Sequence, residues 1–97
     1  MSQSERRLLT IDVERRGYGR RYTSLPVDEL RQDGFSIRFE GAYIRPHHID
    51  LLEGDTIRWR DGGRLFQGRI AAISRTEQIL DARLTDVTPL PPDAFFP

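Results

Sequence analysis

Residues 54–74, GDTIRWRDGGRLFQGRIAAIS, restrict the fold of this chain more than any other stretch, because they have the pattern of one β-hairpin. Ile57 and Trp59 alternate with polar neighbours, which is the period of two of a half-buried strand. Asp61-Gly62-Gly63 follows, and glycine permits the positive φ that a tight reversal needs. The returning strand contains Gly68, which predicts a bulge or bend. A long bent strand after a tight hairpin suits a small closed barrel.

Further strands are predicted on both sides of this hairpin. Residues 8–14, 35–40 and 78–87 alternate between apolar and polar side chains, so each is expected to bury one face. A short strand is expected to begin at Tyr22, and residues 42–45 are expected to resume the strand that Gly41 interrupts. A single turn is expected after Pro46.

One short helix is predicted over residues 24–31. Ser24 is a suitable cap, Pro26 suits a first helical turn, and Asp28 and Glu29 complement the positive end of the helix dipole. The helix is expected to end at Asp33-Gly34 after two turns. A helix this short is stable only if its apolar side chains pack on a sheet.

Together these elements predict an all-β fold, a small β-barrel or sandwich of five to six strands with one short helix. The 97 residues suffice for one domain. We expect a single β-barrel domain over residues 1–88 and an extended, proline-rich arm over 89–97. The prolines of this arm are expected to keep it outside the sheet.

The composition narrows the class of function. The formal net charge is zero, which argues against a grip on nucleic acid by the whole protein surface. There is no cysteine, so disulfides and cysteine-based zinc sites are excluded. No apolar run approaches the roughly 18 residues of a membrane span, and the N-terminus has no long apolar core of a secretory signal. We expect no membrane association and, by default, a cytoplasmic origin.

Catalytic and metal sites find little support in the sequence. His47, His48 and Asp50 are the only candidate ligand set, but adjacent histidines on a strand point to opposite faces and no third histidine exists. A polar turn whose imidazoles are exposed or cap a backbone group explains them better than a metal site does. The sequence contains no nucleophile-elbow pattern. The carboxylates that could pair for acid–base catalysis lie at turns or beside arginines, where ion pairs explain them. We expect a protein that is not an enzyme and binds no metal or cofactor.

The loop at residues 15–22 is the first candidate for contact with a partner. Arg15, Arg16, Arg20 and Arg21 surround Gly17-Tyr18-Gly19. Arginines for phosphates and a tyrosine for stacking suit RNA or single-stranded DNA. Arginine and tyrosine are also enriched in protein interfaces, so a loop that orders against a protein partner is the competing interpretation.

The sheet surface and the tail supply further candidates. Arg38, Arg58 and Arg60 are predicted to face outward, either as a solvated face with cross-strand ion pairs or towards a neighbouring subunit or a DNA channel. Trp59 is expected in the core. An exposed pair of phenylalanines at the end of the tail is a liability unless it docks, either on its own barrel or in a neighbour. The tail residues singled out for partner contacts are Pro91, Phe95 and Phe96.

The order of features over residues 35–87 resembles that of the head-closure, or head–tail joining, proteins of tailed-bacteriophage necks. FSIRF is followed by LLEGDTIRW, a Gly-containing hairpin arm and the strand ILDARLTDV. Gly54-Asp55-Thr56-Ile57 and Gly63-Arg64-Leu65-Phe66-Gln67 occupy the places of the family's Gly-Asp turn and hairpin. The similarity covers a little over half of the chain. The helix-like VDEL segment departs from it, because more sheet is expected there.

The resemblance implies a structural protein without catalysis. Copies would form a ring, a hexamer or dodecamer, in the connector between the portal or adaptor and the tail. The protein would be made in the bacterial host cytoplasm and end in the virion neck. Loops and arms would contact neighbouring subunits, and some side chains would face passing DNA without sequence specificity. The alternative is a small-barrel nucleic-acid-binding module that uses the loop at 15–22.

Overall fold

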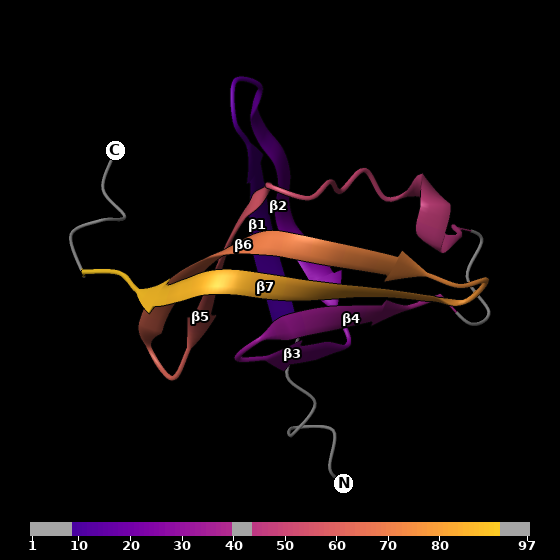
Figure 1. Ribbon diagram of the computed structural model, residues 1–97. Coiled ribbons are helices and arrows are strands. Elements are labelled where there is room, and N and C mark those ends of the chain that lie inside the picture. Colours follow the sequence, from indigo (N-terminus) through magenta and orange to yellow (C-terminus); the bar gives the residue numbers. More distant parts are fainter. Residues whose placement is uncertain (1–8, 40–43, 92–97) are drawn as a thin grey trace, which may run out of the picture.

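A computed structural model describes residues 9–39 and 44–91 of the chain, and almost all of its regular structure is β-strand (Figure 1). The strands are β1 (Leu9–Arg15), β2 (Gly19–Val27), β3 (Glu29–Arg31), β4 (Gly34–Arg38), β5 (Thr56–Asp61), β6 (Arg64–Arg75) and β7 (Ile79–Pro89). A 3-10 turn, η2 (Pro46–His48), lies where a single turn was expected after Pro46. The prediction of an all-β chain is confirmed, with seven strands in the described residues instead of five or six.

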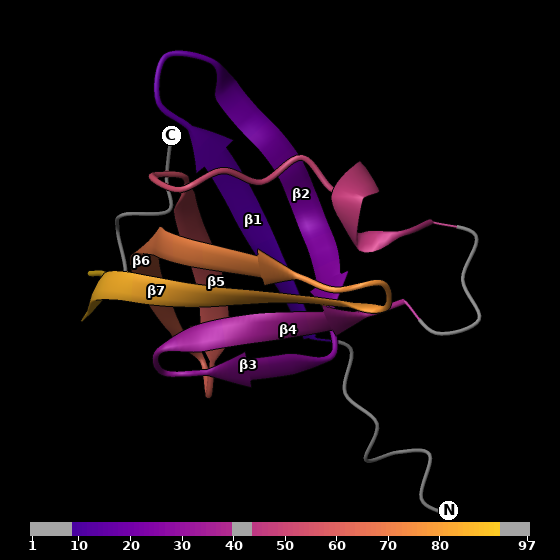
Figure 2. The same ribbon diagram turned by 45° about the vertical axis from the view of Figure 1, so that its right-hand side comes forward.

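The strands form one antiparallel sheet in the order β2-β1-β5-β6-β7-β4-β3, which curls into a half-barrel (Figure 2). The two strands at the ends of this order, β2 and β3, are consecutive in the chain and are separated only by Asp28. The main chain therefore links one end of the curled sheet to the other. The Asp28 backbone amide also donates a hydrogen bond to the Ser36 carbonyl at 2.9 Å, which holds this crossing point against β4.

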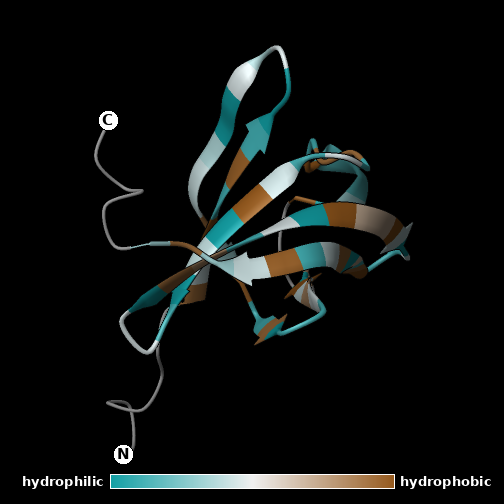
Figure 3. Cartoon of the chain, turned by 60° about the vertical axis from the view of Figure 1, so that its left-hand side comes forward, coloured by the Kyte–Doolittle hydropathy of each residue, from teal (hydrophilic) through white to brown (hydrophobic). Residues whose placement is uncertain are grey.

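The core fills the inside of the curl. The alternating side chains predicted to point inward are buried on β4, β5 and β7, and Trp59 lies in the core as expected. On β1, Ile11 and Val13 are buried and Leu9 is half-buried. Figure 3 shows the resulting alternation of hydrophobic and hydrophilic residues along the strands. Leu51, from the segment between η2 and β5, adds a loop residue to the core. The buried hydrophobic cluster consists of Ile11, Val13, Val27, Phe35, Ile37, Phe39, Leu51, Ile57, Trp59, Ile70, Leu80, Ala82 and Leu84.

The predicted helix over residues 24–31 is wrong, because this segment forms the end of β2 and all of β3. Val27 pairs with Leu9 and is buried, and Leu25 pairs with Ile11. A two-turn helix has a costly nucleus and few hydrogen bonds, whereas β1 offers a ready ladder of partners. Pro26 is tolerated because β2 is at the end of the sheet order.

The predicted bend near Gly68 is confirmed. The β6–β7 register shifts between Gln67 and Arg69 and again between Ile70 and Ala72. A Cβ on Gly68 would lie 3.1 Å from a methyl group of Val87, so the glycine admits a close neighbour at the bend. Asp86 has a positive φ of 56° beside the same irregularity. The bends let two long strands follow the curl of the sheet.

The sheet extends into the proline-rich tail. β7 runs through Pro89, which pairs with Phe66, and the Leu90 amide donates to the Leu65 carbonyl at 2.8 Å. The expectation that the tail leaves the sheet at residue 89 is therefore too early by one or two residues. Within the described ranges, no helix is long and apolar enough to cross a membrane.

Candidate functional site

The β1–β2 hairpin extends away from the curled sheet and ends in the predicted contact loop (Figure 1). The Tyr18 amide donates to the Arg15 carbonyl at 2.9 Å, and Gly17 and Gly19 take positive φ values of 83° and 84°. Glycine adopts this conformation without steric cost, so the sequence GYG closes the hairpin. The side chain of Tyr18 is 76% exposed, and Arg16 and Arg20 are exposed beside it.

The five side chains that the sequence grouped in this loop fall into two sets. Arg16, Tyr18 and Arg20 form the exposed tip, which we call the hairpin tip. Arg15 and Arg21 lie at its base and point to the segment before β5. Arg15 donates from Nε and Nη2 to the two carboxylate oxygens of Asp55, both at 2.9 Å, and from Nη2 to Asp50 at 3.1 Å. Arg21 also pairs with Asp50.

These ion pairs fix the charge state of the hairpin base. The hydrogen bond to Asp55, followed by that to Asp50, raises the pKa of Arg15. Hydrogen bonds from Arg15 and then Arg21 lower the pKa of Asp50. The Asp50 amide donates to the Tyr22 hydroxyl at 2.8 Å, and Asp55 accepts from the Leu52 amide at 2.9 Å. The hairpin is therefore braced against residues 50–55 at its base, and its tip is exposed.

The local sequence pattern does not reveal this brace, because Arg15 and Asp55 are forty positions apart. A second arginine that sequence reasoning passed over holds the other side of the same segment. Arg75, at the end of β6, donates to the carbonyl oxygens of Pro46, Ile49 and Leu51 at 3.3, 3.1 and 3.1 Å. The structure shows that Asp55 is buried, and a buried carboxylate requires a cation or several donors.

The candidate histidine site is explained by local structure. His48 Nδ1 accepts a hydrogen bond from the Arg45 amide at 3.0 Å, and the rings of His47 and His48 lie 4.2 Å apart. The carboxylate of Asp50 forms ion pairs with Arg15 and Arg21. In the part of the chain that the structure describes, no three histidine, cysteine or acidic side chains converge on a point where they could hold a metal ion.

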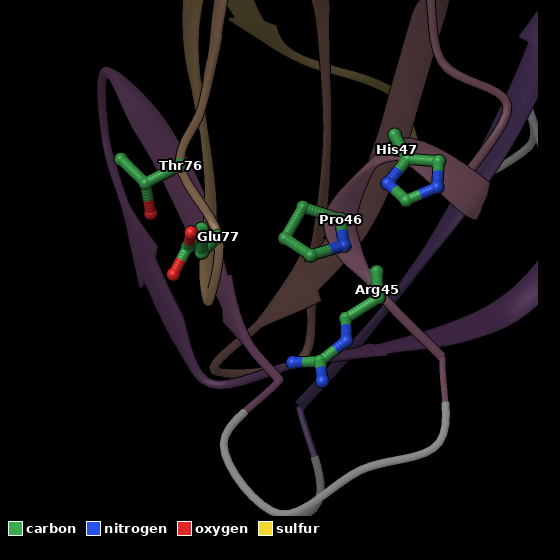
Figure 4. A pocket seen from close by; sticks show the side chains of 5 residues that line it. All are labelled: Arg45, Pro46, His47, Thr76 and Glu77. Atoms are coloured by element: carbon green, nitrogen blue, oxygen red, sulfur yellow. The ribbon is translucent and has the colours of Figure 1, made fainter.

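An open pocket of about 370 Å³ lies between η2 and the β6–β7 turn (Figure 4). Arg45, Pro46 and His47 line one side, and Thr76 and Glu77 line the other. Figure 4 shows Arg45 and Glu77 on opposite sides of the opening. The mixture of cationic, anionic and apolar groups on an open surface carries no recognisable reaction chemistry.

The three arginines predicted to face a channel do not form one cluster. Arg38 is on β4, while Arg58 and Arg60 are on β5, and two strands separate β4 from β5. Arg58 donates to Glu14 and to Gln67, both at 2.9 Å, as expected for cross-strand pairs on an outer face. Arg38 and Arg60 are exposed.

In the tail, Pro91 is exposed at the last described position. Phe95 and Phe96 lie outside the described residues. Comparisons with models of protein families, with curated proteins and with solved structures found no match to this chain.

Proposed function

We propose that this protein is a non-enzymatic structural component of a tailed-phage virion that forms a ring in the head–tail connector. The observation that carries the proposal is the braced hairpin: an exposed arginine–tyrosine–arginine tip on an arm whose base is held by Arg15, Asp50 and Asp55. An arm already fixed in direction loses little conformational freedom when it contacts a neighbour. Tyrosine and arginine are the residues that interfaces favour.

The curled β-sheet adds support at the level of fold. The chain departs from the head-closure proteins in two ways, because the segment between the first strand and Phe35 is short and contains the helix-like VDEL. The structure has strand in this segment, which removes the second departure and leaves the first. This support is analogy, because one fold hosts many functions.

Under this proposal the protein is made in the bacterial host cytoplasm and assembles in the virion neck as a hexamer or dodecamer. The hairpin tip and the tail residues Pro91, Phe95 and Phe96 contact neighbouring subunits or the portal, adaptor and tail proteins. Arg15 and Arg21 position the arm from its base. Arg38, Arg58 and Arg60 are the candidates to face passing DNA, which they would bind without sequence specificity.

The test is the solution mass by light scattering over a concentration series, alone and with purified portal rings, followed by electron microscopy. We expect rings for the unchanged chain and their loss in the variant Arg16→Ala/Tyr18→Ala/Arg20→Ala. The matched control, Leu52→Ala/Arg64→Ala/Arg83→Ala, removes three exposed side chains elsewhere and is expected to assemble normally. A chain that stays monomeric under all these conditions would contradict the proposal.

The second candidate is a nucleic-acid-binding module, which the same tip favours because it presents two guanidinium groups beside an exposed tyrosine. A mobility-shift titration with single-stranded DNA and RNA separates the two functions. Binding by the monomer at moderate salt, abolished in the triple-alanine tip variant and retained in its control, would favour the module.

A further inference from the structure

A second cavity, of about 150 Å³, opens at the end of the half-barrel where β5 turns into β6. Its apolar lining comes from Leu9, Leu30, Trp59 and Phe66, on four different strands. The rings of Trp59 and Phe66 are stacked with their centroids 5.9 Å apart. We call this cavity the mouth pocket. Arg31, Gln32, Arg60, Asp61 and Gly62 also line it, so the pocket is as polar as it is apolar.

The mouth pocket has a volume of about 150 Å³ and an apolar wall beside polar lining residues. A fully apolar cavity of about this volume holds a benzene molecule in another protein, so the space is large enough for one aromatic ring. Aromatic side chains also pack well on other aromatic rings in stacked or edge-to-face geometry. The occupant that fits is therefore a phenylalanine side chain on a segment free to enter from outside.

This chain carries two such side chains. Phe35 and Phe39 are buried in the core, and Phe66 forms the pocket wall. Phe95 and Phe96 remain, at the end of the tail. We propose that the mouth pocket of each subunit receives a phenylalanine from the tail of a second copy of this chain. The inference rests on the proposed function, because it names the contact by which the ring subunits are joined.

The position and composition of the tail favour a second copy over the tail's own pocket. The tail leaves the sheet beside the pocket wall, since Pro89 pairs with Phe66. Prolines at 89, 91 and 92 favour the extended polyproline conformation, which advances about 3.1 Å per residue. Only Asp93 and Ala94 lie between Pro92 and Phe95. Two residues are too few for the chain to turn back and bring Phe95 to the pocket of its own subunit.

The arrangement also explains how a ring would close. The tail and the mouth pocket are different surfaces of one subunit, so their contact is heterologous. Heterologous contacts repeat from subunit to subunit and give a ring when the rotation closes.

Cross-linking between two single-cysteine variants tests the contact, and the absence of native cysteine makes the readout unambiguous. Gln32→Cys places a thiol at the mouth pocket, and Ala94→Cys places one beside Phe95, so both phenylalanines and the apolar wall are retained. The matched control is Gln78→Cys, also an exposed glutamine, in the turn between β6 and β7 at the far end of β6. Differently tagged full-length chains are mixed under mild oxidation.

We expect the disulfide between the Gln32→Cys and Ala94→Cys chains to form at least tenfold faster than that between the Gln78→Cys and Ala94→Cys chains. Adding Phe95→Ala/Phe96→Ala to the Ala94→Cys chain is expected to abolish this difference. Equal rates for the two pairs would overturn the inference. So would a chain carrying both Gln32→Cys and Ala94→Cys that forms only the internal disulfide at every concentration, because the tail would then occupy its own pocket.

Light scattering on the same samples separates the failure of this inference from the failure of the proposed function. Rings that form without the preferred cross-link, and that survive Phe95→Ala/Phe96→Ala, would overturn the tail contact and leave the ring standing. The preferred cross-link in a chain that forms dimers or open chains, with no ring in the presence of portal, would support the contact and contradict the neck function.

Discussion

Asp55→Ala is expected to remove the centre of the brace that holds the hairpin. Asp55 is 2% exposed and accepts three hydrogen bonds of 2.9 Å, two from Arg15 and one from the Leu52 amide. Alanine leaves the Leu52 amide without this partner and Arg15 with Asp50 alone. Asp55→Asn keeps the shape and some of the acceptors, so it is the milder variant.

The cost follows from these contacts. A hydrogen bond to a charged group contributes a net of about 1.5–3 kcal/mol, and breaking a fully buried ion pair costs about 3–5 kcal/mol. Arg15 is 15% exposed and retains Asp50, which reduces the loss. We expect Asp55→Ala to lower the free energy of unfolding by about 2–4 kcal/mol. A domain of this size has roughly 5–15 kcal/mol in total, so the loss is large.

Urea unfolding followed by the fluorescence of Trp59, the only tryptophan, measures this quantity directly. Glu53→Ala is the matched control, since Glu53 is an exposed carboxylate two positions away. It should change the stability by no more than about 0.5 kcal/mol. A double-mutant cycle with Arg15→Ala should show a coupling of about 1–3 kcal/mol. If Asp55→Ala and Glu53→Ala unfold at the same urea concentration, the brace contributes nothing and the reasoning is wrong.

Three further outcomes are expected. Hydrogen bonds from Arg15 and Arg21 hold the pKa of Asp50 below its ordinary value of 3.8, so its stabilising contribution is complete above about pH 4 and is lost as the pH falls through the folded-state pKa. Urea unfolding of Asp50→Asn should therefore show a shallower loss of stability as the pH falls below about 4, and an unchanged slope would contradict this. Gly34→Ala should destabilise by about 1–3 kcal/mol, because its Cβ would lie 2.3 Å from the Ala82 carbonyl oxygen. Gly68→Ala should lower the stability less than Gly34→Ala does, because its nearest obstacle is a side-chain methyl at 3.1 Å. Thermal unfolding of both variants measures the two losses, and the reverse order would refute the steric argument. Removing the three side chains of the hairpin tip should leave the melting temperature within about 3 °C of the unchanged chain, since the tip is exposed.

The two parts of the candidate site differ in how far the sequence reveals them. The exposed tip was visible, because glycines on both sides of Tyr18 predict a tight turn whose side chains face solvent. The brace was not visible, because an arginine in a loop has the same local pattern whether it is free or paired. The structure separates Arg15 and Arg21 from the tip by bringing a distant loop to them. The mouth pocket likewise needs four strands in place before it exists.

The sequence by itself determined the all-β class, most strand positions and the inward residues, because period-two alternation is a local property of each strand. Only the tertiary structure decided the fate of residues 24–31. Their caps and proline favour a helix locally, but pairing of Leu25 with Ile11 and of Val27 with Leu9 makes them strand. The tertiary structure also decided that the sheet curls. Its two end strands, β2 and β3, follow one another directly in the chain. Such outcomes depend on contacts between distant positions, whose free energy outweighs the small preferences of single residues.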